Sequence, residues 1–316
     1  MEIINKTRNM KIPIINKHLL RNYWKNKYLF LLLFPGIVWY IIFKYFPIYG
    51  LSLAFKDFSF RKGIFGSAWV GLKHFIYLFS LSGFRKAFLN TLIINFYQLV
   101  FCFPAPIIFA LLLNEIIHIR FKKIVQTISY LPHFLSWVIL AGMFMQLLSP
   151  STGALNQLLG FFGIGPFYFL GDPKYFRGTL VLTNLWKSIG WNSIVYLAAL
   201  SNVDTQLYEA ARLDGVNKFQ EIIHVTLPSI AGIVTVMLIF QMGKLFGDNF
   251  DQVFNLYNAA VYEVGDVLGT YTYRMGLRDM QYSLSTAVSL VTNVISFSLV
   301  ILTNAVAKKI NDYGIW

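Results

Sequence analysis

The sequence predicts an all-α integral membrane protein with six transmembrane helices. Of the 316 residues, 56% are hydrophobic and only 13% are charged, and the mean hydropathy is +0.57. A soluble domain carries about 25% charged residues, so this composition indicates a protein that lies in the lipid bilayer. The apolar residues also gather into six runs, each close to the roughly 20 residues that a helix needs to cross the hydrocarbon core.

The six runs follow one another along the whole chain. The first is long enough to cross the bilayer and lacks the small-residue cleavage site of a signal peptide. Pro104 and Pro106 predict a kink in the second run, and Pro132 predicts a break near the start of the third. The expected spans are residues 28–46, 88–113, 124–148, 180–200, 230–246 and 284–306.

Basic residues beside the spans indicate which connections face the cytoplasm. Residues 1–27 contain seven Lys or Arg and one Glu, and Lys and Arg near span ends favour the cytoplasmic side. A basic tail that binds nucleic acid is the less common reading, so no nucleic-acid partner is expected. The tail at residues 307–316 and the loop after the second span are assigned to the same, cytoplasmic side. These two segments carry Lys308 and Lys309, and Arg120, Lys122 and Lys123.

The predicted organisation is therefore a basic cytoplasmic segment at 1–27, a six-span domain at 28–306 and a cytoplasmic tail at 307–316. The loop after the fifth span is acidic and falls outside by parity. Residues 47–87 also fall outside, although they are basic. We keep that assignment because the loop is long and most other charges agree with it. The single cysteine, Cys102, lies in an apolar run and is interpreted as a packing residue.

A polar segment at residues 201–229 separates the fourth and fifth spans. It contains Glu209-Ala-Ala-Arg-Leu-Asp-Gly215 and, nine residues later, Val225-Thr-Leu-Pro228. Asp204 can cap a first short helix, and Gly215 stands where a left-handed stop residue belongs. Asn217 with Gln220 predicts a capping box that starts a second helix.

The second helix of this segment has one apolar face, and Pro228 is expected to prevent it from running unbroken into the next span. A helix pair of this kind between two spans indicates a docking surface. The alternative is an ordinary connecting loop. A loop would explain any one of these features but explains their combination poorly. The apolar face consists of Val216, Phe219, Ile222 and Ile223.

The segment resembles the EAA loop of permease subunits of bacterial binding-protein-dependent ABC importers. That pattern is Glu-Ala-Ala, three residues, Gly, nine residues, Ile, any residue, Leu-Pro, and Val225 is the single departure. The resemblance implies the type I ABC importer permease fold and a cytoplasmic helix that docks in a groove of a separate ATPase. The implied ATPase-coupling residues are Glu209, Ala210, Ala211, Asp214, Gly215, Val216 and Phe219.

Further stretches are similar to the carbohydrate-uptake branch of these permeases, and within it to the polysaccharide type. They include Tyr45-Phe-Pro-Ile-Tyr-Gly50, Phe103-Pro-Ala-Pro106 and Ala110-Leu-Leu-Leu-Asn-Glu115. The resemblance implies that substrate contacts lie in the middle of the fourth span and in the outer part of the fifth. Carried onto this sequence, the substrate-pathway residues are Asn184, Ser188, Trp191, Gln241, Lys244 and Asn249.

The residues themselves support such a pathway. Asn184, Ser188 and Trp191 share one helix face at spacings of four and seven. Aromatic rings beside amides and hydroxyls suit a sugar, although interhelical hydrogen bonding and packing would also explain them. Lys244 departs from the family, in which an apolar or aromatic residue is commoner. Lys187 and Lys244 are expected to pair with Asp248 or to extend toward the outer surface.

Chemistry of its own is not expected in this chain. The one Gly-Lys pair, Gly243-Lys244, lacks the rest of a phosphate-binding loop, and none of the five histidines has metal-ligand spacing. The chain is therefore predicted to be a translocation subunit and not an enzyme, with no metal or catalytic residue. A secondary carrier would need acidic groups inside spans, and an enzyme of lipid-linked sugars would need catalytic carboxylates that only Asp248 and Asp251 could supply.

The implied function is the import of an oligosaccharide or polysaccharide fragment across the bacterial cytoplasmic membrane, driven by ATP. The expected partners are a second EAA-bearing permease subunit, two copies of an ATP-binding subunit that hold ATP and Mg, and an extracellular solute-binding lipoprotein that delivers the sugar. Both termini are expected in the cytoplasm.

The topology is tested by labelling a cysteine placed at Gln220 in a Cys102→Ala background. We expect a membrane-impermeant thiol reagent to label it only after the cells are permeabilised, whereas Glu263→Cys, in the loop after the fifth span, should react in intact cells. Labelling of the residue-220 cysteine in intact cells would overturn the orientation.

Overall fold

The computed structural model describes residues 25–247, 249–311 and 313–315, so most of the predicted N-terminal basic segment lies outside the described residues. The chain forms two units, Met1–Ser52 and Leu53–Trp316. In the first, helix α2 (Lys27–Tyr40) continues through a π-helical turn (Ile41–Tyr45) into a 3-10 helix (Phe46–Phe55) that enters the second unit. None of the side chains of α2 is buried.

The second unit begins with a short antiparallel hairpin. Strand β1 (Lys56–Asp57) pairs with β2 (Ala68–Trp69), with Lys56 opposite Trp69, and α3 (Gly63–Gly66) lies between them. Helix α4 (Lys73–Ser80) follows.

The predicted second and third spans are both interrupted where prolines fall. One residue, Phe103, separates helix α5 (Ser82–Cys102) from α6 (Pro104–Asn114). Helix α7 (Ile119–Tyr130) runs into a 3-10 turn (Leu131–Phe134), and α8 (Trp137–Leu147) leaves it at a bend of 105°. Proline cannot donate the backbone hydrogen bond of a helix interior, which explains both positions. Helix α9 (Ala154–Phe161) follows α8.

Helix α10 (Pro173–Ser201) leads to the polar segment, which folds as α11 (Thr205–Leu213) and α12 (Lys218–Glu221). Contrary to the sequence prediction, Pro228 does not break the helix. Helix α12 passes through a π-helical turn (Ile222–Thr226) into α13 (Leu227–Gly243), so that Lys218–Gly243 is one helix of 26 residues. Pro228 is the second residue of α13, where the wider turn before it tolerates the missing N–H.

The chain then folds into a set of short helices before its last span. These are α14 (Phe250–Leu256), a 3-10 turn (Ala259–Val261), α15 (Tyr262–Gly265), α16 (Leu268–Tyr273) and a π-helical turn (Arg274–Arg278). The last helix, α17 (Tyr282–Asn311), extends beyond the predicted end of the sixth span.

Not all of the six predicted spans form helices that are both long enough and apolar enough to cross a membrane. Within residues 25–247, 249–311 and 313–315, four helices are long and apolar enough to cross a membrane, and α7 with α8 makes a fifth if the bent pair is one span. The fourth predicted span lies inside α10, which is 29 residues long but is not among these helices. Its polar side chains lower its hydropathy, and Thr179, Thr183 and Ser193 among them are buried within the protein.

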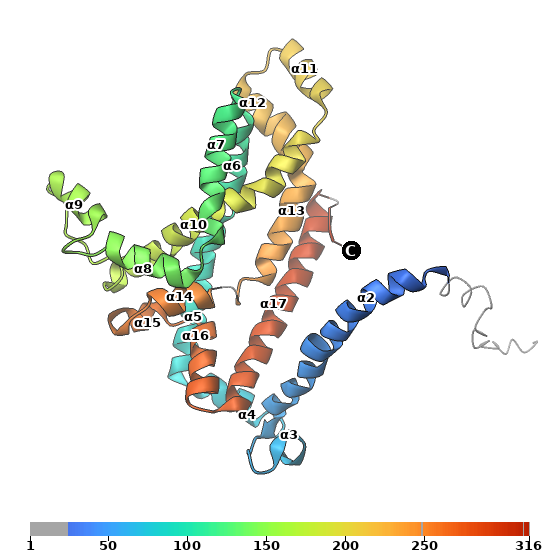
Figure 1. Ribbon diagram of the computed structural model, residues 1–316, viewed down its shortest axis with the longest axis vertical. Helices are drawn as coiled ribbons and strands as arrows, with labels where there is room; N and C mark the ends of the chain where they lie inside the picture. Colours follow the sequence, from blue (N-terminus) through green and yellow to red (C-terminus); the bar gives the residue numbers. More distant parts are fainter. Residues whose placement is uncertain (1–24, 248, 312, 316) are drawn as a thin grey trace, which may run out of the picture. The chain divides into compact units, whose positions relative to one another are not determined.

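Helix α10 forms the centre of the second unit. It packs against α5, α6, α7 and α13, and α13 packs along α17 (Figure 1). One core cluster joins α5, α8, α10 and α14 around Ile94, Leu140 and Phe176. Gly190 permits the contact with α7, because a Cβ at that position would lie 2.2 Å from the carbonyl oxygen of Ser129.

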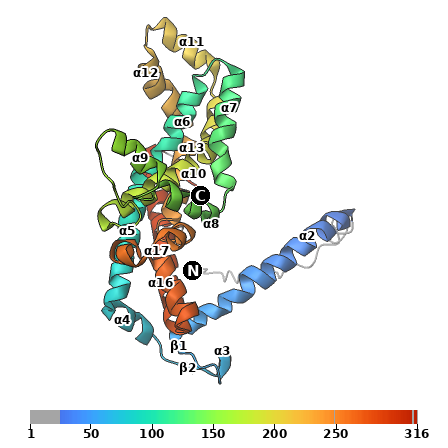
Figure 2. The same ribbon diagram turned by 60° about the vertical axis from the view of Figure 1, so that its left-hand side comes forward.

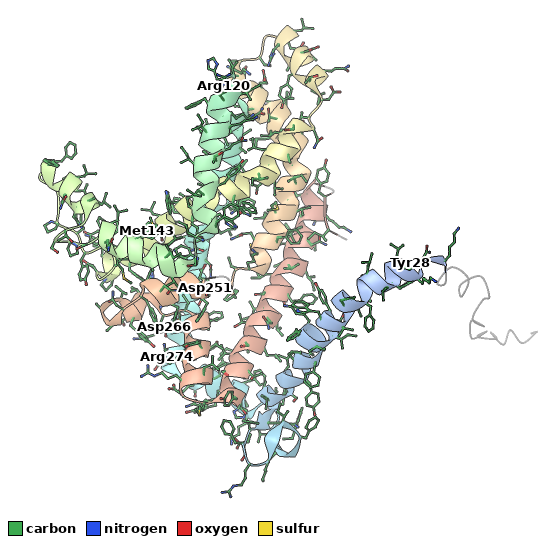
Figure 3. All side chains as sticks on the ribbon, in the orientation of Figure 1. Tyr28, Arg120, Met143, Asp251, Asp266 and Arg274 are labelled. Carbon is green, nitrogen blue, oxygen red and sulfur yellow. The ribbon has the colours of Figure 1, made fainter. Side chains whose placement is uncertain are left out.

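An ion pair braces the short helices between α13 and α17. Both guanidinium NH2 groups of Arg274 bond the carboxylate of Asp266, at 2.8 and 3.2 Å (Figure 3). The guanidinium also lies over the ring of Tyr262, at 4.8 Å. Burial disfavours its charge, but the hydrogen bonds and charge of Asp266 raise the pKa of Arg274 above its ordinary value. The segment is thus a fixed part of the fold.

We expect Gly190→Ala to destabilise the protein by about 1–3 kcal/mol, because the added methyl group overpacks the contact between α10 and α7. Gly178→Ala on the same helix is the matched control, since nothing lies within 4 Å of its Cβ position. Thermal melting of the purified complex measures both. Equal melting temperatures for the two variants would show that the close approach is not tight.

Candidate functional site: a helix pair and a polar cavity

The polar segment folds as the two helices that its caps predict. Asp204 accepts a hydrogen bond from the N–H of Gln206 at 2.9 Å and begins α11. Gly215 ends it with a φ of 78°. The N–H of Val216 reaches the carbonyl of Ala211, and the N–H of Gly215 reaches that of Arg212, at 3.3 and 3.1 Å. This is the paired bonding of a Schellman motif, which fixes the reversal between α11 and α12.

The second helix starts with the predicted capping box. The N–H of Gln220 donates to Asn217 Oδ1, and the N–H of Asn217 donates to Gln220 Oε1, both at 2.9 Å. Each side chain satisfies a backbone donor that a helix start leaves open. The joint between the two helices is therefore defined on both sides of Gly215.

Ion pairs tie this joint to the rest of the bundle. The buried carboxylate of Glu221 accepts from Arg212 and from Lys218, each at 3.2 Å, and Lys218 also lies 3.2 Å from Glu115, which follows α6. The hydrogen bond and charge of Glu221 raise the pKa of Arg212. Helices α11, α12 and the end of α6 thus meet at one place (Figure 2).

A groove of about 440 Å³ lies at this meeting point, and Glu209 is among its lining residues. The side chain of Phe219 is 71% exposed. Glu209, Ala210, Asp214 and Gly215 are also exposed, whereas Ala211 and Val216 are half-buried. Leu213 is 89% exposed and was not among the predicted coupling residues. The signal that could have found it is an apolar side chain at the end of a polar helix, two residues before the stop glycine.

A second, polar cavity of about 370 Å³ lies among α5, α6, α8, α10 and α13. It is lined by five of the six residues predicted for the substrate pathway, which are Asn184, Ser188, Gln241, Lys244 and Asn249.

Trp191, the sixth, does not line this cavity. Its ring stacks on that of His133 at 4.5 Å and meets Phe134 edge-on at 5.3 Å. His133 does line the cavity, so Trp191 lies behind a lining residue. The helix face toward the cavity is instead continued by Asn192. The lining residues that were not predicted for the substrate pathway include Asn95, Gln98, His133, Trp137, Lys187 and Asn192.

Lys187 holds together the break between α7 and α8. Its ammonium group donates to the carbonyls of Pro132 at 3.4 Å, of His133 at 3.0 Å and of Leu135. A helix break leaves carbonyls short of intrahelical partners, and lipid cannot satisfy them. The Pro132 carbonyl also accepts from the backbone N–H of Leu135, at 3.2 Å. An ammonium group has three donors, and Lys187 lies against three carbonyls. The expected partner, Asp248, lies outside the described residues.

Buried amides close the cavity beside α14. Gln252 donates to the carbonyl of Leu180 at 2.6 Å and to Thr183 Oγ1 at 2.9 Å, and Gln98 donates to Gln252 Oε1 at 3.3 Å. Asn249, directly before α14, donates to Asn95 Oδ1. This network holds the side chains of α5 in place at the cavity wall.

Comparison with known proteins identifies the family. The family described as binding-protein-dependent transport system inner membrane component matches residues 80–312. The chain belongs to this family. The predicted resemblance to ABC importer permeases and the predicted permease fold are confirmed, and the permease is a translocation subunit and not an enzyme.

A relative and a solved structure that resemble this permease carry names from polysaccharide transport. It is 42% identical over 300 residues to the polygalacturonan/rhamnogalacturonan transport system permease protein YteP of Bacillus subtilis, with 95% of this chain and 94% of that one covered. It is 37% identical over 318 residues to protein LplB of the same organism, with 100% of each covered. A solved chain of a bacterial alginate ABC transporter, in complex with an alginate pentasaccharide-bound periplasmic protein, superposes with a TM-score of 0.86 at 38% identity, covering 94% and 100%.

We expect Lys187→Met to destabilise the complex by about 1–3 kcal/mol, because it removes the ammonium donor from the backbone carbonyls at the helix break. Lys174→Met, on the exposed first turn of the same helix, should change stability little. Thermal melting and the uptake rate in proteoliposomes measure the effect. A Lys187→Met variant with wild-type stability and uptake would show that the break holds without this side chain.

Proposed function

We propose that this permease is one of two membrane subunits of an ATP-driven importer, and that it passes an acidic oligosaccharide from an external binding protein to the cytoplasm. The observation that carries the proposal is that the helix pair and the polar cavity are joined by continuous helices. Helix α10 runs from the cavity residue Asn184 to within a few residues of α11, and one helix, Lys218–Gly243, runs from α12 to the cavity residue Gln241.

This connection supports coupling between the two places. The Schellman joint, the capping box and the ion pairs of Glu221 leave few freely rotating bonds between α11 and α12. A displacement of the pair is then transferred to α10 and α13, which form two walls of the cavity. The exposed side chains of Leu213 and Phe219 supply apolar area for a docking protein. The proposed docking partner is the ATPase subunit.

The substrate class rests on the cavity and on the relatives. Amide and hydroxyl groups beside His133 and Trp137 suit the hydroxyls and C–H faces of a sugar. Lys187 and Lys244 are cationic residues of the cavity lining, and ammonium groups suit the carboxylates of an acidic sugar. One related structure is described as a transporter for the import of the acidic polysaccharide alginate.

The proposed complex contains a second permease subunit, two ATPase subunits that bind ATP and Mg, and an extracellular binding protein. It lies in the cytoplasmic membrane of a bacterium, with both termini of this chain inside. Uptake by the reconstituted complex of trigalacturonate, alginate pentasaccharide and maltotriose tests the substrate. We expect uptake of an acidic oligosaccharide, and uptake of maltotriose alone would overturn the acidic class.

Coupling is tested at the joint between α11 and α12. A β-branched residue resists the φ of 78° at Gly215, so Gly215→Val should abolish most sugar-stimulated ATP hydrolysis and uptake. Gly215→Asn is the matched control, because Asn tolerates this conformation, and it should retain most of both activities. Glu209→Lys, in the groove, should lose both as Gly215→Val does.

The ATPase rate is measured with and without sugar-loaded binding protein, beside a pull-down of the ATPase subunit. If Gly215→Val and Glu209→Lys keep wild-type ATPase binding, stimulation and uptake, the helix pair is not the coupling element.

A further inference from the structure

One buried donor at the cavity wall has no hydrogen-bond partner among the residues that the structure describes. Asn95 lies on α5, is only 6% exposed and lines the polar cavity, and its Nδ2 atom makes no hydrogen bond to the described part of the chain. Among the described residues that are not exposed, the only other fully buried side-chain nitrogen or oxygen without a partner is Ser52 Oγ. A buried donor without a partner costs free energy, so a ligand atom that accepts a hydrogen bond at Asn95 is favoured.

The amide of Asn95 is held in place by its neighbour. Asn249 Nδ2 donates to Asn95 Oδ1, and Asn249 is itself buried at the cavity wall. Gln98, three residues further along α5, is fixed by its bond to Gln252. Because one half of the Asn95 amide is already bonded, its other half is oriented before any ligand arrives, which reduces the entropy lost on binding.

The chemistry of the amide selects the ligand group. The nitrogen and oxygen of an Asn side chain are assigned from their hydrogen bonds. If both amides of the pair are turned over, the unpartnered atom of Asn95 becomes the acceptor oxygen. A hydroxyl both donates and accepts, so it satisfies Asn95 in either orientation. A carboxylate accepts only and an ammonium group donates only, so each fits one orientation.

We propose that Asn95, oriented by Asn249, binds a hydroxyl group of the sugar during its passage, so that α5 forms a third wall of the substrate pathway with α10 and α13. This inference rests on the proposed import of an oligosaccharide. It assigns a contact on a helix that neither the sequence pattern nor the family resemblance had singled out.

The test uses the complete complex of permease subunits and ATPase, purified without binding protein. The probe is whichever of radiolabelled trigalacturonate, alginate pentasaccharide and maltotriose the wild-type complex takes up, and its equilibrium binding is measured. We expect Asn95→Leu to weaken binding at least tenfold, which corresponds to about 1.4 kcal/mol. This variant also removes the acceptor of Asn249 and therefore lowers the melting temperature.

The double variant Asn95→Leu/Asn249→Leu separates binding from folding. Replacing both partners of a buried hydrogen bond by apolar groups of similar shape is nearly neutral for stability. The double variant should therefore melt close to the wild-type temperature and still bind the probe at least tenfold more weakly. Recovery of binding together with stability would show that Asn95 is structural, and would overturn the proposal.

Asn90→Leu is the matched control on the same helix. Asn90 is equally buried, does not line the cavity, and is fully bonded to the carbonyls of Glu263 and Asp266 and to Arg177. It should lower the melting temperature and leave probe binding by the folded complex unchanged. Wild-type probe binding by Asn95→Leu would mean that a water molecule satisfies the amide and would overturn the subsite alone. Failure of the wild-type complex to take up any of the three probes would instead remove the proposed function together with the subsite.

Discussion

A helix that breaks inside a membrane protein must find donors for the carbonyls that it releases, and the cavity of this permease depends on how that demand is met. Lys187 reaches from α10 to the carbonyls at the break between α7 and α8. The 105° bend then directs α8 away from α7 and places His133 and Trp137 at the cavity wall. The cationic side chain therefore shapes the cavity as well as charging it.

Local signals in the sequence predicted the polar segment well. The cap at Asp204, the stop at Gly215 and the capping box at Asn217 each depend on atoms within a few residues, so spacing alone determines them. The prediction that Pro228 breaks the helix was wrong, because the feature that accommodates this proline cannot be recognised from spacing. A π-helical turn at Ile222–Thr226 accommodates it, and a widened turn has no spacing signature that single residues reveal.

The cavity was predictable only in part, because five helices form it. The sequence does not determine how each helix is rotated about its axis, and therefore which side chains face the cavity. The face of α10 was placed nearly correctly, yet Trp191 stacks on His133 while Lys187 and Asn192 line the space. Asn95 and Gln98 were visible as polar residues in an apolar run, but nothing along the chain indicates that they meet Asn249 and Gln252 at α14. The break in the third span was expected from Pro132, whereas the donor that satisfies it comes from 55 residues further on.

The unbroken helix from Lys218 to Gly243 also sets a mechanical scale. With 26 residues and a rise of about 1.5 Å each, it is roughly 39 Å long. A tilt of about 10° about the Lys218 end would therefore carry the Gly243 end through roughly 7 Å. In the proposed coupling, small angular movements of the helix pair would thereby become much larger displacements at the polar cavity.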